Sequence, residues 1–319
     1  MVHPIILSDF LDYMKTIKGS SDLTIKEYGY DISIFLKYMK TRFNGLSYGD
    51  LENLEEIEIS DVDKTFIERI SITDLYSYLS YLDKRRDNAP RTRARKVSAL
   101  KSFYEFLYVK TDQISVNPTE KLELPKQSIR NPVYLTLDES RRLLDQVRKQ
   151  KNDFIMRRDY CMIVIFLNCG IRLSELVGIN IDSVKNDILT VIGKGNKERT
   201  VYLNRACIVA VNQYIAVRPK VKDEPALFLS KREKRISTRA VQYRIEKYIT
   251  EIGLDPRLYS VHKLRHTAAT LLYKYGEVDI RTLQQILGHE SVATTQIYTH
   301  LDDETLKNAV KKNPLNNLL

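Results

Sequence analysis

Four clusters in the second half of the chain carry side chains that could break a phosphodiester bond. They are Gly170 to Leu176, Gly193 to Arg199, His262 to His266, and Leu287 to Glu290 leading to Gln296 to His300. Breaking such a bond without metal or water needs a nucleophile, cations that neutralise the charge of the phosphorane, and an acid for the departing oxygen. The clusters contain a candidate for each part.

The cationic candidates are two arginines and a lysine. Arg172 and Arg265 each carry a planar guanidinium that can bond two phosphate oxygens, a task that lysine performs less well. His262 lies three residues before Arg265, so on a helix the two side chains share a face and can reach one phosphate. Lys194 lies between two glycines, where a flexible ammonium could protonate the 5′-oxygen leaving group.

Tyr298 is the candidate nucleophile. A free phenol has a pKa of about 10, so it needs cationic surroundings to lose its proton at neutral pH. His262 and His289 could bind the phosphate or accept that proton, and the sequence leaves open which of them is the base. Glu175 is expected to orient or cap locally, and His266 and His300 are expected to be structural.

Other enzyme classes fit the sequence less well. His262 and His266 have the i,i+4 spacing of a zinc protease, but Lys263 stands where that motif needs a glutamate. No segment has the GxxxxGK[ST] pattern of an ATP-binding loop, and paired carboxylates at metal-nuclease spacing are not evident. We therefore expect a reaction with no metal and no cofactor.

The first part of the chain is predicted to be a bundle of about four helices. Apolar residues recur at helical spacing over 25–39, 75–82 and 97–108. An acidic stretch at 46–63 is predicted as an insertion between the second and third helices, either a partner contact or a tolerated loop.

The second part mixes helices with a small hairpin. Proline-rich residues 117–132 read as a linker, and Thr136 with Glu139 predicts a capping box at the next helix start. A helix is predicted from Asp159 to Cys169, ended by Gly170. Strands are predicted at 188–192 and 199–203, and helices follow Ser237.

Positive charge is concentrated in two places. The net charge is +10, and basic and acidic residues balance within residues 1–130, so the whole excess lies beyond them. The neutral part still holds a basic stretch at 84–101, whose bases are predicted to share a helix face and to contact DNA phosphates. The predicted DNA contacts are Arg85, Arg86, Arg91, Arg93, Arg95, Lys96, Lys101, Lys197, Arg199 and Arg239.

Composition excludes several classes of protein. Apolar residues make up 43% and charged residues 29% of the 319 residues, which is ordinary for a globular protein and suggests two domains. No apolar run approaches the length of a membrane span, and no secretory signal is evident. Three widely spaced cysteines, Cys161, Cys169 and Cys207, fit a reducing compartment, so a cytoplasmic location is expected.

Together the clusters resemble the catalytic domain of the tyrosine recombinases, most of all the Xer-type and phage-integrase branch, from about Asn131 to His300. The resemblance implies a fold that is mainly α with a small β-sheet, arranged as a two-domain, C-shaped DNA clamp. It implies a helical core-binding domain at 1–116, a linker at 117–132, a catalytic domain at 133–302 and a protomer-contacting C-terminal tail at 303–319. The implied catalytic residues are Arg172, Lys194, His262, Arg265, His289 and Tyr298.

The resemblance also implies an activity and partners. The chain is expected to be a site-specific recombinase that cleaves and rejoins DNA through a 3′-phosphotyrosyl intermediate, as a homotetramer or a heterotetramer with a second recombinase. Its role would be chromosome dimer resolution, with a possible DNA translocase as partner, or excision and integration of a mobile element. Two alternatives stay open: relaxation of DNA by a type IB topoisomerase, and a non-catalytic DNA-binding protein derived from a recombinase.

Overall fold

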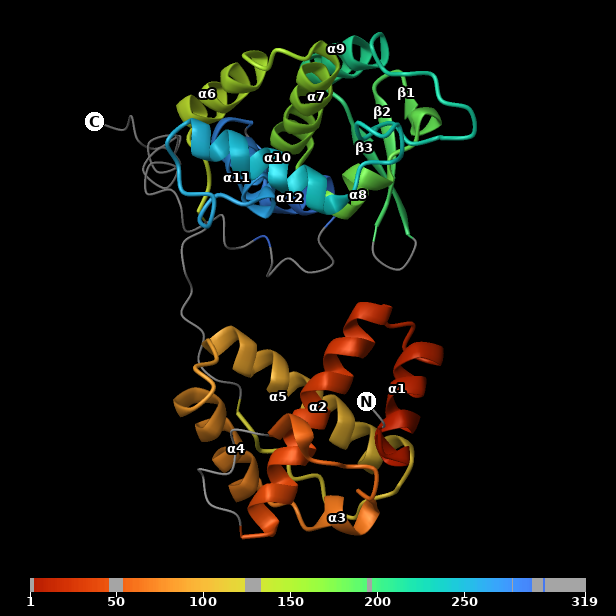
Figure 1. Cartoon of the computed structure of the whole chain (residues 1–319), viewed down its shortest axis with the longest axis vertical. Helices are drawn as coiled ribbons and strands as arrows, with labels where there is room; N and C mark the ends of the chain where they lie inside the picture. The colour runs from red at the N-terminus through yellow and green to blue at the C-terminus, as the bar shows by residue number, and fades with distance from the viewer. Residues whose placement is uncertain are drawn as a thin grey trace, which may run out of the picture. The chain divides into compact units, whose positions relative to one another are not determined.

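A computed structural model gives the fold of the chain (Figure 1). It describes residues 3–45, 54–123, 133–193, 197–276, 278–288 and 295. The chain divides into two compact units, residues 1–129 and residues 130–319. Each unit has its own buried apolar core. The predicted fold class, mainly α with a small β-sheet, is confirmed.

The first unit is a helical bundle. Its helices are α1 (Ile5–Thr16), α2 (Asp22–Phe43), α3 (Lys64–Glu68), α4 (Ile72–Lys84) and α5 (Pro90–Glu105), which continues into a π-helical turn, η2 (Phe106–Lys110). Ser21 caps α2, and Ser71 with Asp74 forms a capping box at the start of α4. Phe35, Tyr78 and Phe103 lie at the centre of the core, where aromatic rings meet edge to face.

The prediction that the bases of residues 84–101 share a helix face that contacts phosphates is wrong for Lys96, and Arg93 and Arg95 also bind carboxylates of the first unit. Lys96 is buried on α5, and its ammonium binds the buried carboxylate of Asp31 on α2 at 2.6 Å. Arg95 donates to the same carboxylate, and Arg93 forms an ion pair with Asp83 of α4. A buried charge is stable only when it is paired, so these bases tie α5 to its neighbours.

The described part of the acidic stretch, residues 54–63, packs against α2. Lys40 binds the carboxylate of Asp61 at 2.6 Å, and Lys37 donates to the carbonyl of Glu55. Asp63 caps α3 by accepting from the backbone of Phe66. These contacts give the described part of the stretch a role inside the first unit, while residues 46–53 lie outside the described residues.

The second unit combines helices with a three-stranded antiparallel sheet that lies to one side of them, with strand order β1-β2-β3 (Figure 1). Residue Leu189 of β2 pairs with Val201 of β3, and both side chains face the core. The elements are α6 (Leu137–Arg148), α7 (Asp153–Cys169), α8 (Leu173–Gly178), η3 (Ile181–Ser183), β1 (Val184–Lys185), β2 (Ile188–Ile192), β3 (Glu198–Tyr202), α9 (Arg205–Ile215), α10 (Thr238–Glu251), α11 (Val261–Tyr275) and α12 (Ile280–Leu287).

Most local predictions for this unit are confirmed. Thr136 and Glu139 form the capping box of α6, β2 has its predicted bounds, and β3 begins one residue earlier than predicted. Gly170 ends α7 with a φ of 58°, a left-handed conformation that favours glycine. The predicted start of α7 at Asp159 is wrong, because Asn152 caps the helix and it begins at Asp153.

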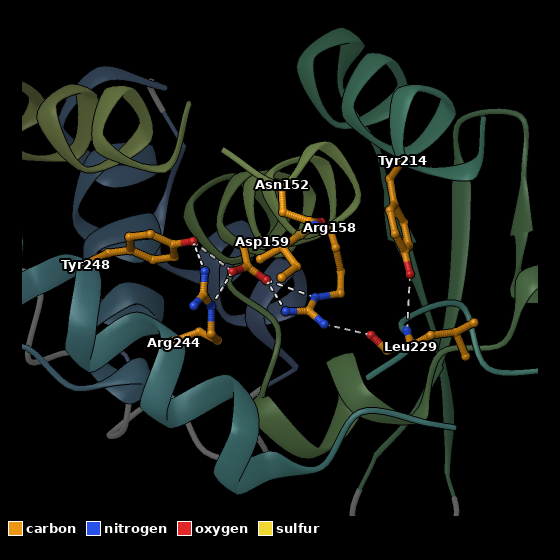
Figure 2. Close-up of polar contacts among 8 residues, drawn as sticks. Asn152, Arg158, Asp159, Tyr214, Leu229, Arg244 and Tyr248 are labelled. Carbon is orange, nitrogen blue, oxygen red and sulfur yellow. Dashed lines mark hydrogen bonds and ion pairs between the residues drawn. The ribbon is translucent and has the colours of Figure 1, made fainter. Parts of the chain in front are cut away.

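A buried ion network joins α7 to α10 (Figure 2). The carboxylate of Asp159, fully buried on α7, accepts from Arg158, from Arg244 of α10 at 2.6 Å, and from the hydroxyl of Tyr248 at 2.8 Å. Arg158 also donates to the carbonyl of Leu229, and so holds the segment that precedes α10. Neither arginine would be stable at this depth without the carboxylate.

Three features are absent from the described residues: a helix that could span a membrane, a disulfide and a group of three potential metal ligands. None of the described helices is both long and apolar enough to cross a membrane. Cys161, Cys169 and Cys207 are buried thiols that form no disulfide. Within the described ranges, no three His, Cys, Asp or Glu side chains are grouped so that they could hold a metal ion.

Candidate active site

The structure describes three of the six predicted catalytic residues. Arg172 occupies the N-cap position of α8, and His262 and Arg265 lie on α11. The other three predicted residues, Lys194, His289 and Tyr298, lie outside the described residues.

Arg172 lies where α7 ends and α8 begins. Its Nη1 donates to Oε1 of Glu175 at 2.8 Å, and its Nη2 donates to the carbonyl of Gly288 at 2.9 Å. The side chain is 38% exposed. These two bonds use two of the five N–H donors of a guanidinium, and the exposed part of the group can bind an anion.

Arg265 is buried beneath this position on α11. Its two terminal nitrogens donate to the carbonyls of Gly170 and Leu287, so it joins the end of α7 to the end of α12. His262 is one turn earlier on α11 and is exposed. Its ring lies edge-on to the ring of His266, with 4.7 Å between the two ring centroids. His262 and Arg265 thus lie three residues apart on one helix, but His262 is exposed and Arg265 is buried, so their reach to one phosphate stays a prediction.

A third arginine, from β3, completes the group. Nη1 of Arg199 donates to the carbonyl of Ile286 at 2.9 Å. We call Arg172, Arg199 and Arg265 the arginine cluster. The last carbonyls of a helix have no partner within it, and cations are favourable there because that end of the helix dipole is negative. The cluster therefore binds three consecutive carbonyls at the end of α12, those of Ile286, Leu287 and Gly288.

Two glycines allow these segments to meet. A Cβ at Gly170 would lie 2.7 Å from Cδ2 of Leu287, and a Cβ at Gly288 would lie 2.9 Å from Cδ of Arg199. Gly288 also has a positive φ of 65°, which ends α12. A larger residue at either position would therefore require the side chain of Leu287 or Arg199 to shift.

Glu175 is the carboxylate inside the cluster. It is 1% exposed, and it accepts from the backbone and guanidinium of Arg172 and from Nε and Nη2 of Arg199. Burial alone would raise the pKa of Glu175, but the bonds from Arg199 and Arg172 outweigh it and lower that pKa. One carboxylate thus binds two of the three guanidinium groups, and the cluster together with Glu175 carries a net positive charge that suits a phosphate.

The predicted DNA contacts of this unit differ in their surroundings. Arg239, in the first turn of α10, and Lys197, beside β3, are exposed. Arg199 is 17% exposed and directed into the cluster. The sequence predicts neither the bonds of Arg199 inside the cluster nor the bridging of two arginines by Glu175. The sequence holds only a weak signal for this role of Arg199. The arginine lies at the start of the second strand of the predicted hairpin, six residues after the glycine that follows the first strand.

Comparisons with known proteins find relatives for both units of the chain. Residues 133–305 match the phage integrase family, and residues 7–111 match the phage integrase N-terminal SAM-like domain. A tyrosine recombinase XerC of Caldanaerobacter subterraneus subsp. tengcongensis is 55% identical over 315 residues, covering 98% of this chain and 88% of the relative. The XerC of Leptospira interrogans is 31% identical over 306 residues, covering 95% of this chain and 91% of the relative.

A solved structure shows the same fold. It is a post-cleavage complex of the XerH site-specific recombinase bound to a palindromic difH substrate, with a TM-score of 0.69 and 21% identity. The likeness covers 98% of this chain and 99% of that chain.

Proposed function

The chain belongs to the phage integrase family and is a site-specific tyrosine recombinase, and from that premise we propose that Tyr298 attacks DNA to form a 3′-phosphotyrosyl link. The bond from phosphorus to the 5′-oxygen breaks as the bond to the phenolic oxygen forms, and a 5′-hydroxyl is released. The link keeps the phosphoester energy, so a 5′-hydroxyl from a second duplex can reseal the strand without ATP.

In this proposal the predicted catalytic residues share the work of stabilising the phosphorane and moving protons. Arg172 and Arg265 neutralise the phosphorane, and Lys194 protonates the 5′-oxygen as it departs. His262 and His289 bind the phosphate or accept the phenolic proton, with the choice between them left open.

The observation that carries the proposal is the arginine cluster at the end of α12. His289 follows directly on the last clamped carbonyl, that of Gly288, and Tyr298 lies ten residues beyond that glycine. The described groups therefore place net positive charge at the start of the segment that carries the proposed nucleophile. No part of this chemistry uses a metal or a cofactor.

The proposed substrate is duplex DNA at a recombination site, bound by four protomers. A core-binding domain at 1–116 and a catalytic domain at 133–302, joined by the linker at 117–132, would form a C-shaped clamp, with the tail at 303–319 docked on a neighbouring protomer. The 55% identity to a XerC favours chromosome dimer resolution in the cytoplasm over mobile-element transfer. A second recombinase and a DNA translocase are partners that this role would admit.

Covalent capture tests the proposed function. Wild type and Tyr298→Phe would be mixed with nicked suicide duplexes from a library of genomic fragments, in EDTA and without ATP, and resolved on a denaturing gel. A protein-linked 3′ end with wild type alone is the expected result, and the captured sequence would identify the site. Bound DNA with no adduct would favour the non-catalytic alternative, and relaxation without exchange between duplexes would favour the topoisomerase.

The basic stretch should affect DNA affinity through its exposed members. Arg91 is exposed at the start of α5, whereas Lys96 is buried against Asp31. We expect Arg91→Ala to weaken binding and to lower the slope of log affinity against log salt by about 1, because one phosphate contact is lost. Lys96→Met should leave that slope unchanged and lower stability instead. Titration of both variants at several salt concentrations would decide, and equal slopes for Arg91→Ala and wild type would reject the contact.

A further inference from the structure

The surroundings of Arg199 differ from those expected for a DNA contact. The bonds described above occupy Nε, Nη1 and Nη2, and a Cβ at Gly288 would lie only 2.9 Å from the Cδ of Arg199. Its guanidinium is thus enclosed by Glu175 on one side and by the end of α12 on the other. The guanidinium of Arg199 therefore binds other groups of the site, an arrangement that suits a role in holding those groups in place.

We propose that Arg199 is a positioning residue for strand cleavage, which holds Glu175 and the end of α12 and through them sets the guanidinium of Arg172. The inference rests on the proposed function, because cleavage is the reaction whose rate it governs. It replaces the prediction from the sequence that Arg199 itself contacts DNA.

The pattern of shared acceptors supports this role. Oε1 of Glu175 accepts from the guanidinium of Arg172 and from Nε of Arg199, while Oε2 accepts from the backbone of Arg172 and from Nη2 of Arg199. Each oxygen therefore bridges the two arginines. Each arginine also binds α12, Arg172 through Gly288 and Arg199 through Ile286. The result is a closed frame of two arginines, one carboxylate and one helix end.

Removal of Arg199 would open this frame on two sides. Glu175 would keep only its donors from Arg172, and the end of α12 would lose one of its three cationic anchors. A displacement of about 1 Å in a catalytic group can cost about 100-fold in rate. Lysine cannot replace the arginine fully, since a single ammonium lacks the fork that reaches Glu175 and Ile286 together.

The first test measures cleavage by the full chain. A nicked suicide duplex captured with wild type would be cleaved in single turnover at saturating protein. We expect Arg199→Met to be about 10- to 100-fold slower, with DNA affinity within about 3-fold of wild type and an unchanged salt slope. Arg199→Lys should recover part of the rate. A lower affinity and a lower salt slope with an unchanged rate would overturn the proposal and restore the DNA contact.

A matched control separates positioning from general stability. Arg142 of α6 also donates to a carbonyl at a helix end, that of Ile252 at the end of α10, but outside the arginine cluster. We expect Arg142→Met to cleave within about 3-fold of wild type. Equal losses of rate in Arg142→Met and Arg199→Met, at equal losses of stability, would assign Arg199 a merely structural role.

The pH profile gives a readout that stability alone would not move. Among the described residues, the charged groups that face Glu175 are Arg172 of α8 and Arg199 of β3. Both lower the pKa of Glu175 in the folded protein. In wild type the carboxylate therefore stays charged down to that lowered pKa, and the frame is lost only when the pH falls through it. In Arg199→Met this pKa rises, and the rate should fall at a higher pH on acidification. Superimposable profiles would contradict the proposal.

Hydrogen exchange tests the frame without DNA. The amide of Arg172 donates to Glu175, and the amide of Gly288 closes the end of α12. We expect both amides to exchange faster in Arg199→Met and to be unchanged in Arg142→Met. Unchanged exchange in Arg199→Met would overturn the proposal. If wild type forms no adduct but the amides respond as expected, the proposed function fails while the frame stands.

Discussion

Replacing Arg172 by alanine should slow cleavage of bound DNA by about 100- to 1,000-fold, the usual cost of losing one donor that stabilises transition-state charge. Arg172 has the most exposed side chain of the arginine cluster, and its two bonds to Glu175 and Gly288 fix the direction of its guanidinium. The loss should fall on the cleavage rate more than on affinity, because the charge on the phosphorane exceeds that on the bound phosphate.

Single-turnover cleavage at saturating protein would measure this effect. Arg172→Lys should lie between wild type and alanine, since lysine keeps the charge but not the fork. Arg157→Ala is a suitable control, because Arg157 pairs with Asp153 on the surface of α7 in the same unit. A rate for Arg172→Ala within a few-fold of the control would show that Arg172 does not act on the phosphate.

Replacing Asp159 should cost the second unit about 3–5 kcal/mol of stability, the typical result of removing one partner from a buried ion pair. The change leaves Arg158, with a side chain 4% exposed, and Arg244, 15% exposed, without their carboxylate (Figure 2). The hydroxyl of Tyr248 also loses its acceptor. Asp159→Asn keeps the volume of the side chain, so a large loss in that variant would come from charge and not from a cavity.

Urea unfolding followed separately for the two units would measure the loss. Asp153→Asn serves as the comparison, since it breaks an exposed i,i+4 pair on the same helix and should cost about 1 kcal/mol or less. Equal stabilities for Asp159→Asn and Asp153→Asn would mean that the buried network contributes no more than a surface pair.

Local chemistry made part of this fold predictable. The box of Thr136 and Glu139, the stop at Gly170 and the bounds of β2 depend on neighbours within a few residues, and all three are confirmed. The start of α7 was missed because its first turn mixes charged and apolar residues, so the pattern became clear only from Asp159 onward.

Pairings between residues far apart in the chain could not be predicted from the sequence. The basic stretch has the composition of a phosphate-binding surface, yet Lys96 meets a carboxylate 65 residues away. Likewise, the chemistry of the site identified Arg172 and Arg265, whereas the role of Arg199 depends on a carbonyl 87 residues away. A charged side chain gains stability from a buried partner or from solvent, and only the tertiary fold decides between them.

The arginine cluster, which binds the carbonyls at the end of α12, also bears on when during synthesis the protein becomes able to cut DNA. Its bonds join Arg172 to a residue 116 positions later and Arg199 to one 87 positions later, while Arg265, its third member, also binds Gly170, 95 positions earlier. Contacts of such sequence separation form late, because loop closure must precede them. A nascent chain still lacking α12 therefore has no assembled cluster, and the capacity to cut DNA arises only once the second unit is synthesised and folded.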